Sequence, residues 1–362
     1  MTAPVCVYRG EALASYNFGP AHPFGPQRHA AFINELERRG LHERVCQCVP
    51  VMAARDAIET FHTASYIDKV IALSKTGTGM LDAGDTPAFK GMYEASQFVV
   101  GSVLDGIERI LTGKCARVFV PIAGLHHAQR DSAAGFCVFN DIGIAIEVLR
   151  RQHRIRRIAY IDIDAHHGDG VFYAFADDPD LCIVDFHQDG RTLYPGTGAL
   201  GETGIDNAVG TTMNVPMPPG ATDDLLIHMW PAAEAFIEKA SPEFIILQAG
   251  ADSLDGDPSP RCNTLQRPTP LSRNASRYLR IEYVMAALSP SAGAAITLTT
   301  WPVPGQLLLL LSWTDTKNHW LELPGLMPHP APRIAQVRRQ SGNYPFRSNT
   351  RPAKRASHHQ GT

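Results

Sequence analysis

The sequence predicts an α/β fold built on a central, mostly parallel sheet, and two features lead to this prediction. Short apolar segments that end in carboxylates alternate with segments of helical periodicity, as expected when strands and helices follow one another along the chain. The composition, with 44% hydrophobic and 19% charged residues among 362, is typical of a folded globular chain. It excludes a wholly disordered chain and a collagen-like one.

The expected strands are continuous apolar runs, as in parallel sheets that are covered on both faces. They comprise residues 157–165, 181–187 and 243–252, and helices are expected over residues 138–152 and 223–240, the second interrupted by Pro231. Each of these strands ends in polar side chains. Because ligands bind outside the carboxyl ends of parallel strands, we expect the three ends to converge on one site.

The strongest site signal is the motif Asp-Ile-Asp-Ala-His-His-Gly-Asp-Gly at residues 162–170. Side chains two residues apart at a strand end point the same way, so Asp164 and His166 can bind one ion side by side. Asp162 lies on the same face, two residues earlier in the strand. Another strand end supplies Asp252. Two carboxylates and one imidazole suit a divalent metal with open positions; zinc is the default, and Fe(II) or Co(II) also fits. The alternative is that these residues only cap strands and helices.

A second signal is the adjacent pair His126 and His127, which precedes the segment Ala-Gly-Phe-Cys-Val-Phe-Asn-Asp at residues 134–141. Two such histidines can act as a general base and its electrostatic partner. Each needs a carboxylate to fix its tautomer, and Asp162 and Asp169 are available beside the expected metal ligands. The alternative is a pair of surface or core histidines without a catalytic role.

Together these motifs resemble the superfamily of histone deacetylases, acetoin-utilization proteins and acetylpolyamine amidohydrolases, over about residues 7–258. Further matching segments lie at residues 19–23, 62–66, 84–87 and 193–198. The resemblance implies the three-layer arginase-deacetylase fold. It also implies a metal-dependent amide hydrolase that removes acetyl or other acyl groups from lysine side chains, polyamines or similar small amides.

The resemblance also implies roles for individual residues. Asp164, His166 and Asp252 would bind the catalytic zinc, and a potassium ion is implied as a second cofactor. The tandem pair would be His126 and His127, backed by Asp162 and Asp169 respectively. The remaining implied positions are the tunnel residues Gly135, Phe136 and Tyr194, the rim residue Asp85, and a potassium site formed by Asp162, Asp164, His166, Asp185 and Phe186. An arginase-like two-metal site is not favoured, because His167 and Gly168 occupy positions where a second ion needs carboxylates.

The rest of the chain suggests a cytoplasmic enzyme that does not enter a membrane. The N-terminus shows no signal peptide, and the longest apolar run is five leucines, whereas a membrane span needs roughly 20 residues. Seven cysteines do not indicate a disulfide framework. Cys46 and Cys48 form a Cys-x-Cys motif with no second pair nearby in the sequence, so a zinc knuckle is not expected.

The charge changes sign after Pro258, which predicts two parts: a catalytic domain over residues 1–258 and a tail over residues 259–362. The first 258 residues carry a net charge of −13, whereas the last 104 carry +10 and 12 of the 27 prolines. The tail is expected to be aberrant and poorly ordered, and the sheet incomplete without it. Its arginines are scattered rather than interleaved with aromatic residues, which argues against nucleic-acid binding.

The resemblance implies a Gly-Gly-Gly-Gly-Tyr loop whose tyrosine stabilises an oxyanion, and the sequence lacks this loop. Codons compatible with residues 293–306 can, in a shifted frame, spell Gly-Gly-Tyr-Asn-Leu-Asp-Asn-Leu-Ala-Arg-Ala-Trp-Ala. The tail is therefore interpreted as out of frame from about Pro258 or Ser259, with deacetylase activity impaired; a genuine divergent extension is the alternative. A non-catalytic relative that keeps the metal and binds acylated ligands or a partner is the second functional hypothesis.

Overall fold

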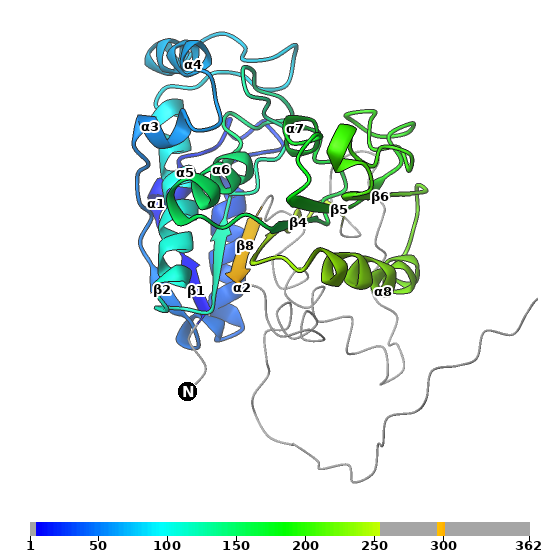
Figure 1. Cartoon of the computed structure of the whole chain (residues 1–362). Coiled ribbons are helices and arrows are strands. Elements are labelled where there is room, and N and C mark those ends of the chain that lie inside the picture. The colour runs from blue at the N-terminus through cyan, green and yellow to red at the C-terminus, as the bar shows by residue number, and fades with distance from the viewer. Residues whose placement is uncertain (1–4, 254–294, 301–362) are drawn as a thin grey trace, which may run out of the picture. The chain divides into compact units, whose positions relative to one another are not determined.

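The computed structural model describes residues 5–253 and 295–300, all within the compact unit Met1–Thr314 (Figure 1). The described strands form one sheet in the order β2-β1-β3-β8-β7-β4-β5-β6. Their bounds are β1 Val5–Tyr8, β2 Cys46–Cys48, β3 Arg117–Pro121, β4 Ile158–Asp162, β5 Leu181–Gln188, β6 Thr212–Met217, β7 Phe244–Gln248 and β8 Ala295–Thr300.

Helices cover both faces of this sheet. The α-helices are α1 Glu11–Ala14, α2 Gln27–Arg38, α3 Arg55–Ile58, α4 Ala64–Thr76, α5 Met92–Leu111, α6 Asp141–His153, α7 Asp169–Ala174 and α8 Asp223–Ala240, and short 3-10 helices span Leu41–Glu43 and Asp206–Ala208. Within the described ranges, no helix has both the length and the apolar character needed to cross a bilayer.

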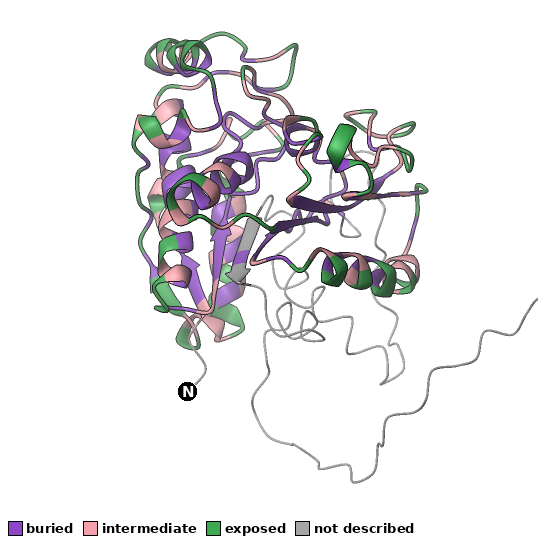
Figure 2. Cartoon of the chain, viewed as in Figure 1, coloured by how far each residue is buried: buried purple, intermediate pink, exposed green. Residues whose placement is uncertain are grey.

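Strand β4 shows how the sheet separates two cores. Ile158 and Tyr160 belong to a core that also contains residues of α5 and α6, whereas Ala159 and Ile161 belong to a second core with residues of α2 and α8. This alternation is the period-2 pattern of a strand that is buried on both faces. Figure 2 shows β4 and β5 buried, and α8 with exposed residues along its outer side. The predicted three-layer α/β fold is confirmed.

Two blocks of parallel strands make up most of the sheet. Strands β2, β1 and β3 form one block, and β7, β4, β5 and β6 form the other. Strand β8 joins the blocks because it pairs antiparallel with β3 on one side and with β7 on the other. The sheet is therefore mostly parallel, as predicted, with one antiparallel member.

Beyond residue 258, the described part of the chain contributes one strand to the sheet, the segment Ala295–Thr300. This segment fills the position between β3 and β7, and the side chain of Leu298 is fully buried. A six-residue run rich in β-branched residues suits this position, where two neighbouring strands offer unpaired backbone groups. The other residues of the predicted tail, including the proposed frame change near Pro258, lie outside the described residues.

Strands β4 and β7 are shorter than predicted, whereas β5 extends one residue further than predicted. Beyond Asp162 the amide of Ile163 still donates to the carbonyl of Gln248 in β7 at 3.2 Å, but the next amides with a strand-like spacing bond to side chains. The amide of Asp164 donates to Asp162 Oδ1 at 3.0 Å, and the amide of His166 donates to Asp164 Oδ1 at 2.9 Å. Helix α8, in contrast, continues through Pro231, which is exposed. A helix tolerates proline best on its solvent side, where water can bind the freed carbonyl.

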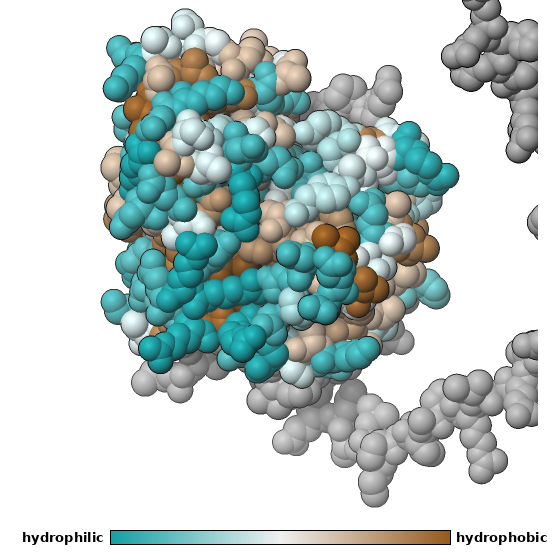
Figure 3. Space-filling view, turned by 45° about the horizontal axis from the view of Figure 1, so that its top comes forward, coloured by the Kyte–Doolittle hydropathy of each residue, from teal (hydrophilic) through white to brown (hydrophobic). Residues whose placement is uncertain are grey.

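Hydrophilic side chains predominate on the face shown in Figure 3, with apolar side chains in smaller areas between them. Large exposed apolar residues include Val49, Leu200, Ile205 and Val209. Scattered apolar residues of this kind are common on globular proteins and do not by themselves indicate a binding surface.

Candidate active site

The three polar strand ends lie side by side. Asp162, the last residue of β4, is in register with Asp185 of β5 and with Gln248, the last residue of β7. The loop after β4 carries Asp164 and His166, and the loop after β7 carries Asp252. The convergence that the sequence predicts is therefore present in the fold.

Asp164, His166 and Asp252 form a compact group of possible metal ligands. One ligand atom from each lies within 4.8 Å of the others. His166 Nδ1 lies 3.0 Å from Asp164 Oδ1 and 2.8 Å from Asp252 Oδ2. The side chain of Asp164 is buried, whereas those of His166 and Asp252 are 22% and 16% exposed. The group therefore has one side open to solvent.

The charges in this group fit a cation. Burial favours the neutral form of Asp164, but His126 and His166 outweigh burial and hold its pKa well below the usual range. Burial, followed by the charge of Asp164, raises the pKa of Asp252. A divalent ion would replace the proton that His166 shares with the two carboxylates, and it would relieve their repulsion. The donor set of two carboxylates and one imidazole nitrogen thus fits the divalent metal that the sequence predicts.

Each histidine of the tandem pair is held by its own carboxylate. His126 Nδ1 donates to Asp162 Oδ2 at 2.7 Å, and His127 Nδ1 donates to Asp169 Oδ1 at 2.6 Å. The two Nε2 atoms lie 3.1 Å apart, and both imidazoles are buried. Asp169 is the first residue of α7. These are the two carboxylates that the sequence analysis pairs with His126 and His127.

The two histidines differ in charge. Burial lowers the pKa of His126, but Asp162 and Asp164 overcome burial and raise it to about 10. Burial, followed by the charge of His126, lowers the pKa of His127 to about 4 despite Asp169. At neutral pH His126 is therefore cationic, and His127 is a neutral imidazole that can accept a proton.

Asn140 and Asp141, which were given no role from the sequence, shape the histidine loop. The buried carboxylate of Asp141 accepts from the backbone amides of Gly124 at 2.9 Å and Leu125 at 2.7 Å. Asn140 Nδ2 donates to the carbonyl of Ala128 at 2.9 Å, and its Oδ1 caps helix α6. Both ends of the histidine loop are thus tied to the start of α6.

Gln248, Gly250 and Tyr160 were also missed. Gln248 Nε2 donates to Asp164 Oδ2 at 2.8 Å, and the Tyr160 hydroxyl donates to Asp162 Oδ2. A Cβ added at Gly250 would lie 1.9 Å from Asp164 Oδ2, so only glycine permits this approach. The signal available in the sequence was a glutamine at the end of the apolar run Phe244–Gln248.

Two of the predicted tunnel residues, Gly135 and Tyr194, lie next to His127, and Phe136 lies next to His22. The Tyr194 ring centroid is 5.2 Å from that of His127 and 6.3 Å from that of His166. A Cβ added at Gly135 would lie 2.4 Å from the His127 ring, and the Phe136 ring centroid is 4.6 Å from that of His22. Tyr194 is 44% exposed, so it stands where the site opens to solvent.

The predicted rim residue Asp85 is linked to this group through its neighbour Thr86. The Thr86 hydroxyl lies 3.1 Å from the amide nitrogen of Phe136, which donates to it, and 3.3 Å from Asp85 Oδ1. Burial, followed by the hydrogen bond with Asp82, raises the pKa of Asp85 to about 6. Asp82 holds the loop by accepting from three successive backbone amides, those of Gly84, Asp85 and Thr86.

Two of the predicted potassium residues, Asp185 and Phe186, lie on β5, beside the loop that follows β4. Asp185 accepts from His187 Nδ1 at 2.7 Å and from the amide of Gly168 at 2.9 Å. The Phe186 ring stacks on Trp230 in the core toward α8, with a centroid distance of 5.8 Å. Phe186 can therefore face the site only through its backbone.

Comparison with known proteins agrees with this geometry. Residues 22–272 match the histone deacetylase domain family. The acetoin utilization protein AcuC of Bacillus subtilis is 34% identical over 255 residues, which cover 67% of this chain and 65% of AcuC.

Two yeast proteins are similarly related. The histone deacetylase clr6 of Schizosaccharomyces pombe is 32% identical over 70% of this chain and 64% of clr6. The histone deacetylase RPD3 of Saccharomyces cerevisiae is 33% identical over 68% of this chain and 58% of RPD3. The alignments thus span between 58% and 65% of the length of these relatives. The match to the domain family covers more than half of this chain, and the chain belongs to the histone deacetylase family.

Proposed function

We propose that this chain is a metal-dependent amide hydrolase that removes acetyl or related acyl groups from lysine side chains, polyamines or similar amines. The observation that carries the proposal is the group Asp164, His166 and Asp252, which lies beside two buried histidines that are each paired with a carboxylate. Family membership supports the same reaction class. Asp164, His166 and Asp252 would hold a divalent ion, with zinc as the first choice and Fe(II) or Co(II) as alternatives. Such an ion acidifies a bound water and polarises an amide carbonyl.

His127 is our choice for the general base. Its Nδ1–H is bound to Asp169, so Nε2 is the nitrogen that accepts the proton of the attacking water. Its lowered pKa keeps it neutral at neutral pH, and it can return the proton to the leaving amine. His126, protonated by virtue of Asp162 and Asp164, places a positive charge beside the developing oxyanion.

The substrate would enter between Phe136 and Tyr194, next to Gly135. Aromatic rings that line such an entrance would admit a thin aliphatic chain such as that of lysine and exclude wider groups. Asp85 would accept a hydrogen bond from the substrate backbone at the rim. We also propose a potassium ion bound by main-chain carbonyls of Asp162, Asp164, His166 and Phe186 together with Asp185, and a cytoplasmic location.

Removal of the metal tests the proposed reaction. The chain stripped by a chelator is expected to lose hydrolysis of an acetyl-lysine peptide, and added Zn²⁺, Fe²⁺ or Co²⁺ is expected to restore it, because the ion supplies the activated water. Release of acetate and metal content are measured together. Equal turnover in the stripped and reloaded protein would contradict the proposal. A chain that binds the ion tightly and the peptide, but releases no acetate, would support the non-catalytic alternative.

The substitution Gly250→Ala is expected to weaken metal binding by about 10–100-fold, the range typical of residues that orient metal ligands. The added Cβ would overlap Asp164 Oδ2 and displace that carboxylate. Competition with a chelator of known affinity measures the change. Gly201→Ala is the matched control, since a Cβ at Gly201 meets nothing within 4 Å. Unchanged affinity in Gly250→Ala would show that Asp164 is not a ligand.

Binding of an acetyl-lysine peptide is expected to weaken about tenfold as the pH falls from 7 to 5. The pKa of Asp85 is raised to about 6, so its carboxylate is ionised above this pH and neutral below it, and the charge-assisted hydrogen bond to the peptide disappears on acidification. A tenfold change corresponds to about 1.4 kcal/mol, within the range of such bonds. Calorimetry on the wild-type chain and on Asp85→Asn separates this effect from others, because the variant should bind weakly at both pH values.

We further propose that residues 259–362 are read out of frame and that the activity of this chain is reduced as a result. The support is the change of net charge at Pro258 and the absence of a glycine-rich segment ending in tyrosine anywhere in the sequence. The nucleotide sequence around the Pro258 codon is the direct test. A single uninterrupted frame through this codon in independent reads of the gene would favour a divergent extension instead.

A further inference from the structure

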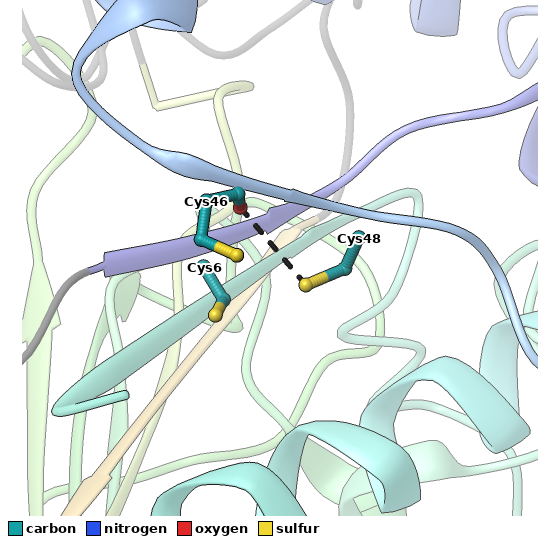
Figure 4. Close-up of side chains that lie close together, drawn as sticks. All are labelled: Cys6, Cys46 and Cys48. Atoms are coloured by element: carbon teal, nitrogen blue, oxygen red, sulfur yellow. Dashed lines mark hydrogen bonds between the residues drawn. The ribbon is translucent and has the colours of Figure 1, made fainter. Parts of the chain in front are cut away.

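Three cysteines from two neighbouring strands form a cluster at the end of the sheet remote from the active site. Strands β1 and β2 are parallel, and Cys6 is in register with Cys46 while Tyr8 is in register with Cys48. Residues in register, and residues two apart on one strand, face the same side of a sheet. The Sγ atoms of Cys6, Cys46 and Cys48 accordingly lie within 4.8 Å of one another (Figure 4).

We propose that Cys6, Cys46 and Cys48 bind a single thiophilic metal ion, of the class of Zn²⁺ or Cu⁺, at a site separate from the active site. Thiolate sulfur is the ligand that such ions prefer in proteins. In a zinc site with bonds of about 2.3 Å, neighbouring sulfurs lie roughly 3.8 Å apart, so side-chain rotations suffice to close the cluster around an ion. From β1 to β4 there are four strand spacings, so the ion would lie roughly 20 Å from Asp164.

A metal ion can reach the cluster from solvent through Cys46. Cys46 is exposed, whereas Cys6 and Cys48 are 1% and 3% exposed. An ion can therefore bind Cys46 first and then the two buried sulfurs. Because Cys46 is exposed, water or an external ligand could supply a fourth ligand from its side.

One neighbouring group opposes a thiolate here and another favours it. The hydrogen bond between Cys6 and Cys115, which is buried just before β3, raises the pKa of Cys6. The positive charge of Arg109 acts to lower the pKa of Cys48 and of Cys115, and this guanidinium lies 2.6 Å from Asp105 and 3.2 Å from the hydroxyl of Tyr8. A divalent ion with three thiolates has a net charge of −1, so a nearby cation stabilises the filled site.

Without an ion, the buried cysteines are thiols. Burial raises the pKa of Cys6 and of Cys48 to about 12, with the neighbouring cysteines adding to the effect. The Cys48 thiol donates to the carbonyl of Cys46 at 3.9 Å. Each sulfur that binds the ion must release its proton to solvent, so the affinity of the site should rise with pH.

Core packing and disulfide formation are the alternatives to metal binding at this cluster. Cysteine is often a small packing residue in a core, but packing does not account for the exposed Cys46. Cys6 and Cys46 are also neighbours at the strand spacing of about 4.8 Å, within the Cα range of a disulfide. In the structure all three sulfurs are free. A metal probe with a sulfur-specific signal separates the three possibilities.

Co²⁺ is that probe, because cobalt–thiolate bonds give a charge-transfer band in the near ultraviolet that oxygen and nitrogen ligands do not give. We expect one equivalent of Co²⁺ to produce the band in the fully reduced double variant Asp164→Ala, His166→Ala. This variant lacks two of the active-site residues that would compete for the ion, so the band reports on the cysteine cluster alone. This result does not depend on the proposed hydrolase activity.

Substitution of the exposed residue Cys46 gives the clearest test of the cysteine cluster. Cys46→Ser should leave the fold intact, abolish the band and weaken Co²⁺ binding at the cluster by about 100-fold or more. The matched control Cys182→Ser removes a buried thiol on the other side of the sheet and should change neither. Circular dichroism confirms that both variants are folded.

Three results would overturn the proposal. One is the absence of a thiolate band at one equivalent of Co²⁺ in the double variant Asp164→Ala, His166→Ala. Another is a band that persists in Cys46→Ser. The third is an intact mass two units lower than expected in protein purified with no reductant and no metal, with Cys6 and Cys46 in one linked peptide, since this would make the cluster a redox pair.

Discussion

Replacement of His127 by alanine is expected to lower kcat for acetyl-lysine hydrolysis by about 10²–10⁴-fold, the usual contribution of a positioned general base. In the structure His127 is the neutral member of the pair, because burial and the charge of His126 lower its pKa to about 4. Above this pH it stays unprotonated, so the wild-type chain should keep its base down to mildly acidic conditions. Alanine leaves no group at this position that can accept a proton.

Bound metal and KM should change little in this variant, because His127 is not among the three residues expected to hold the ion. Steady-state assays and metal analysis measure these quantities. His29→Ala is the matched control, since His29 is buried on α2 outside the site, and it should retain activity. A His127→Ala variant with wild-type kcat would mean that another group takes the proton.

A chain produced in the alternative reading frame after Pro258 is expected to hydrolyse acetyl-lysine peptides about 10²–10³-fold faster than the present chain. This is the usual effect of a single oxyanion hydrogen-bond donor, here the tyrosine of the glycine-rich loop. The two chains share the metal group and both histidines, so they should bind Zn²⁺ with similar affinity. The comparison therefore isolates the part of the chain that stabilises the transition state.

Substitution of that tyrosine by phenylalanine in the alternative-frame chain provides the control. It should return kcat to within about tenfold of the present chain if the hydroxyl is responsible. Equal kcat values for the present and alternative-frame chains would show that residues 259–362 do not limit the reaction, and the proposed impairment would have to be abandoned.

The sequence was most informative where neighbouring residues act together. Asp162, Asp164 and His166 lie within five positions of one another on one strand end, so local periodicity is enough to place them on one face. Helix α8 was predicted at its observed bounds because its apolar residues recur at helical spacing. Asp252 could be added because the end of its strand adjoins that of β4 in a parallel sheet.

Features that depend on distant parts of the chain were not visible in the sequence. Cys6 and Cys46 are forty positions apart and meet only because β1 and β2 pair in parallel. The contact of Gln248 with Asp164 depends in the same way on the pairing of β7 with β4. The insertion of β8 is decided by the vacant position between β3 and β7, which no local pattern in the tail reveals.

The direction of β8 has a consequence for catalysis. Its second residue, Ile296, lies beside Gln248 at the active-site edge, and its last residue, Thr300, lies beside Phe244 at the opposite edge. Six residues of strand span roughly 20 Å, so the polypeptide leaves this strand at the greatest distance from the metal group that the sheet allows. A parallel strand in the same slot would deliver its following loop directly above His126 and His127. The segment Ala295–Thr300 therefore fills this position in the sheet without containing the tyrosine that the family resemblance implies.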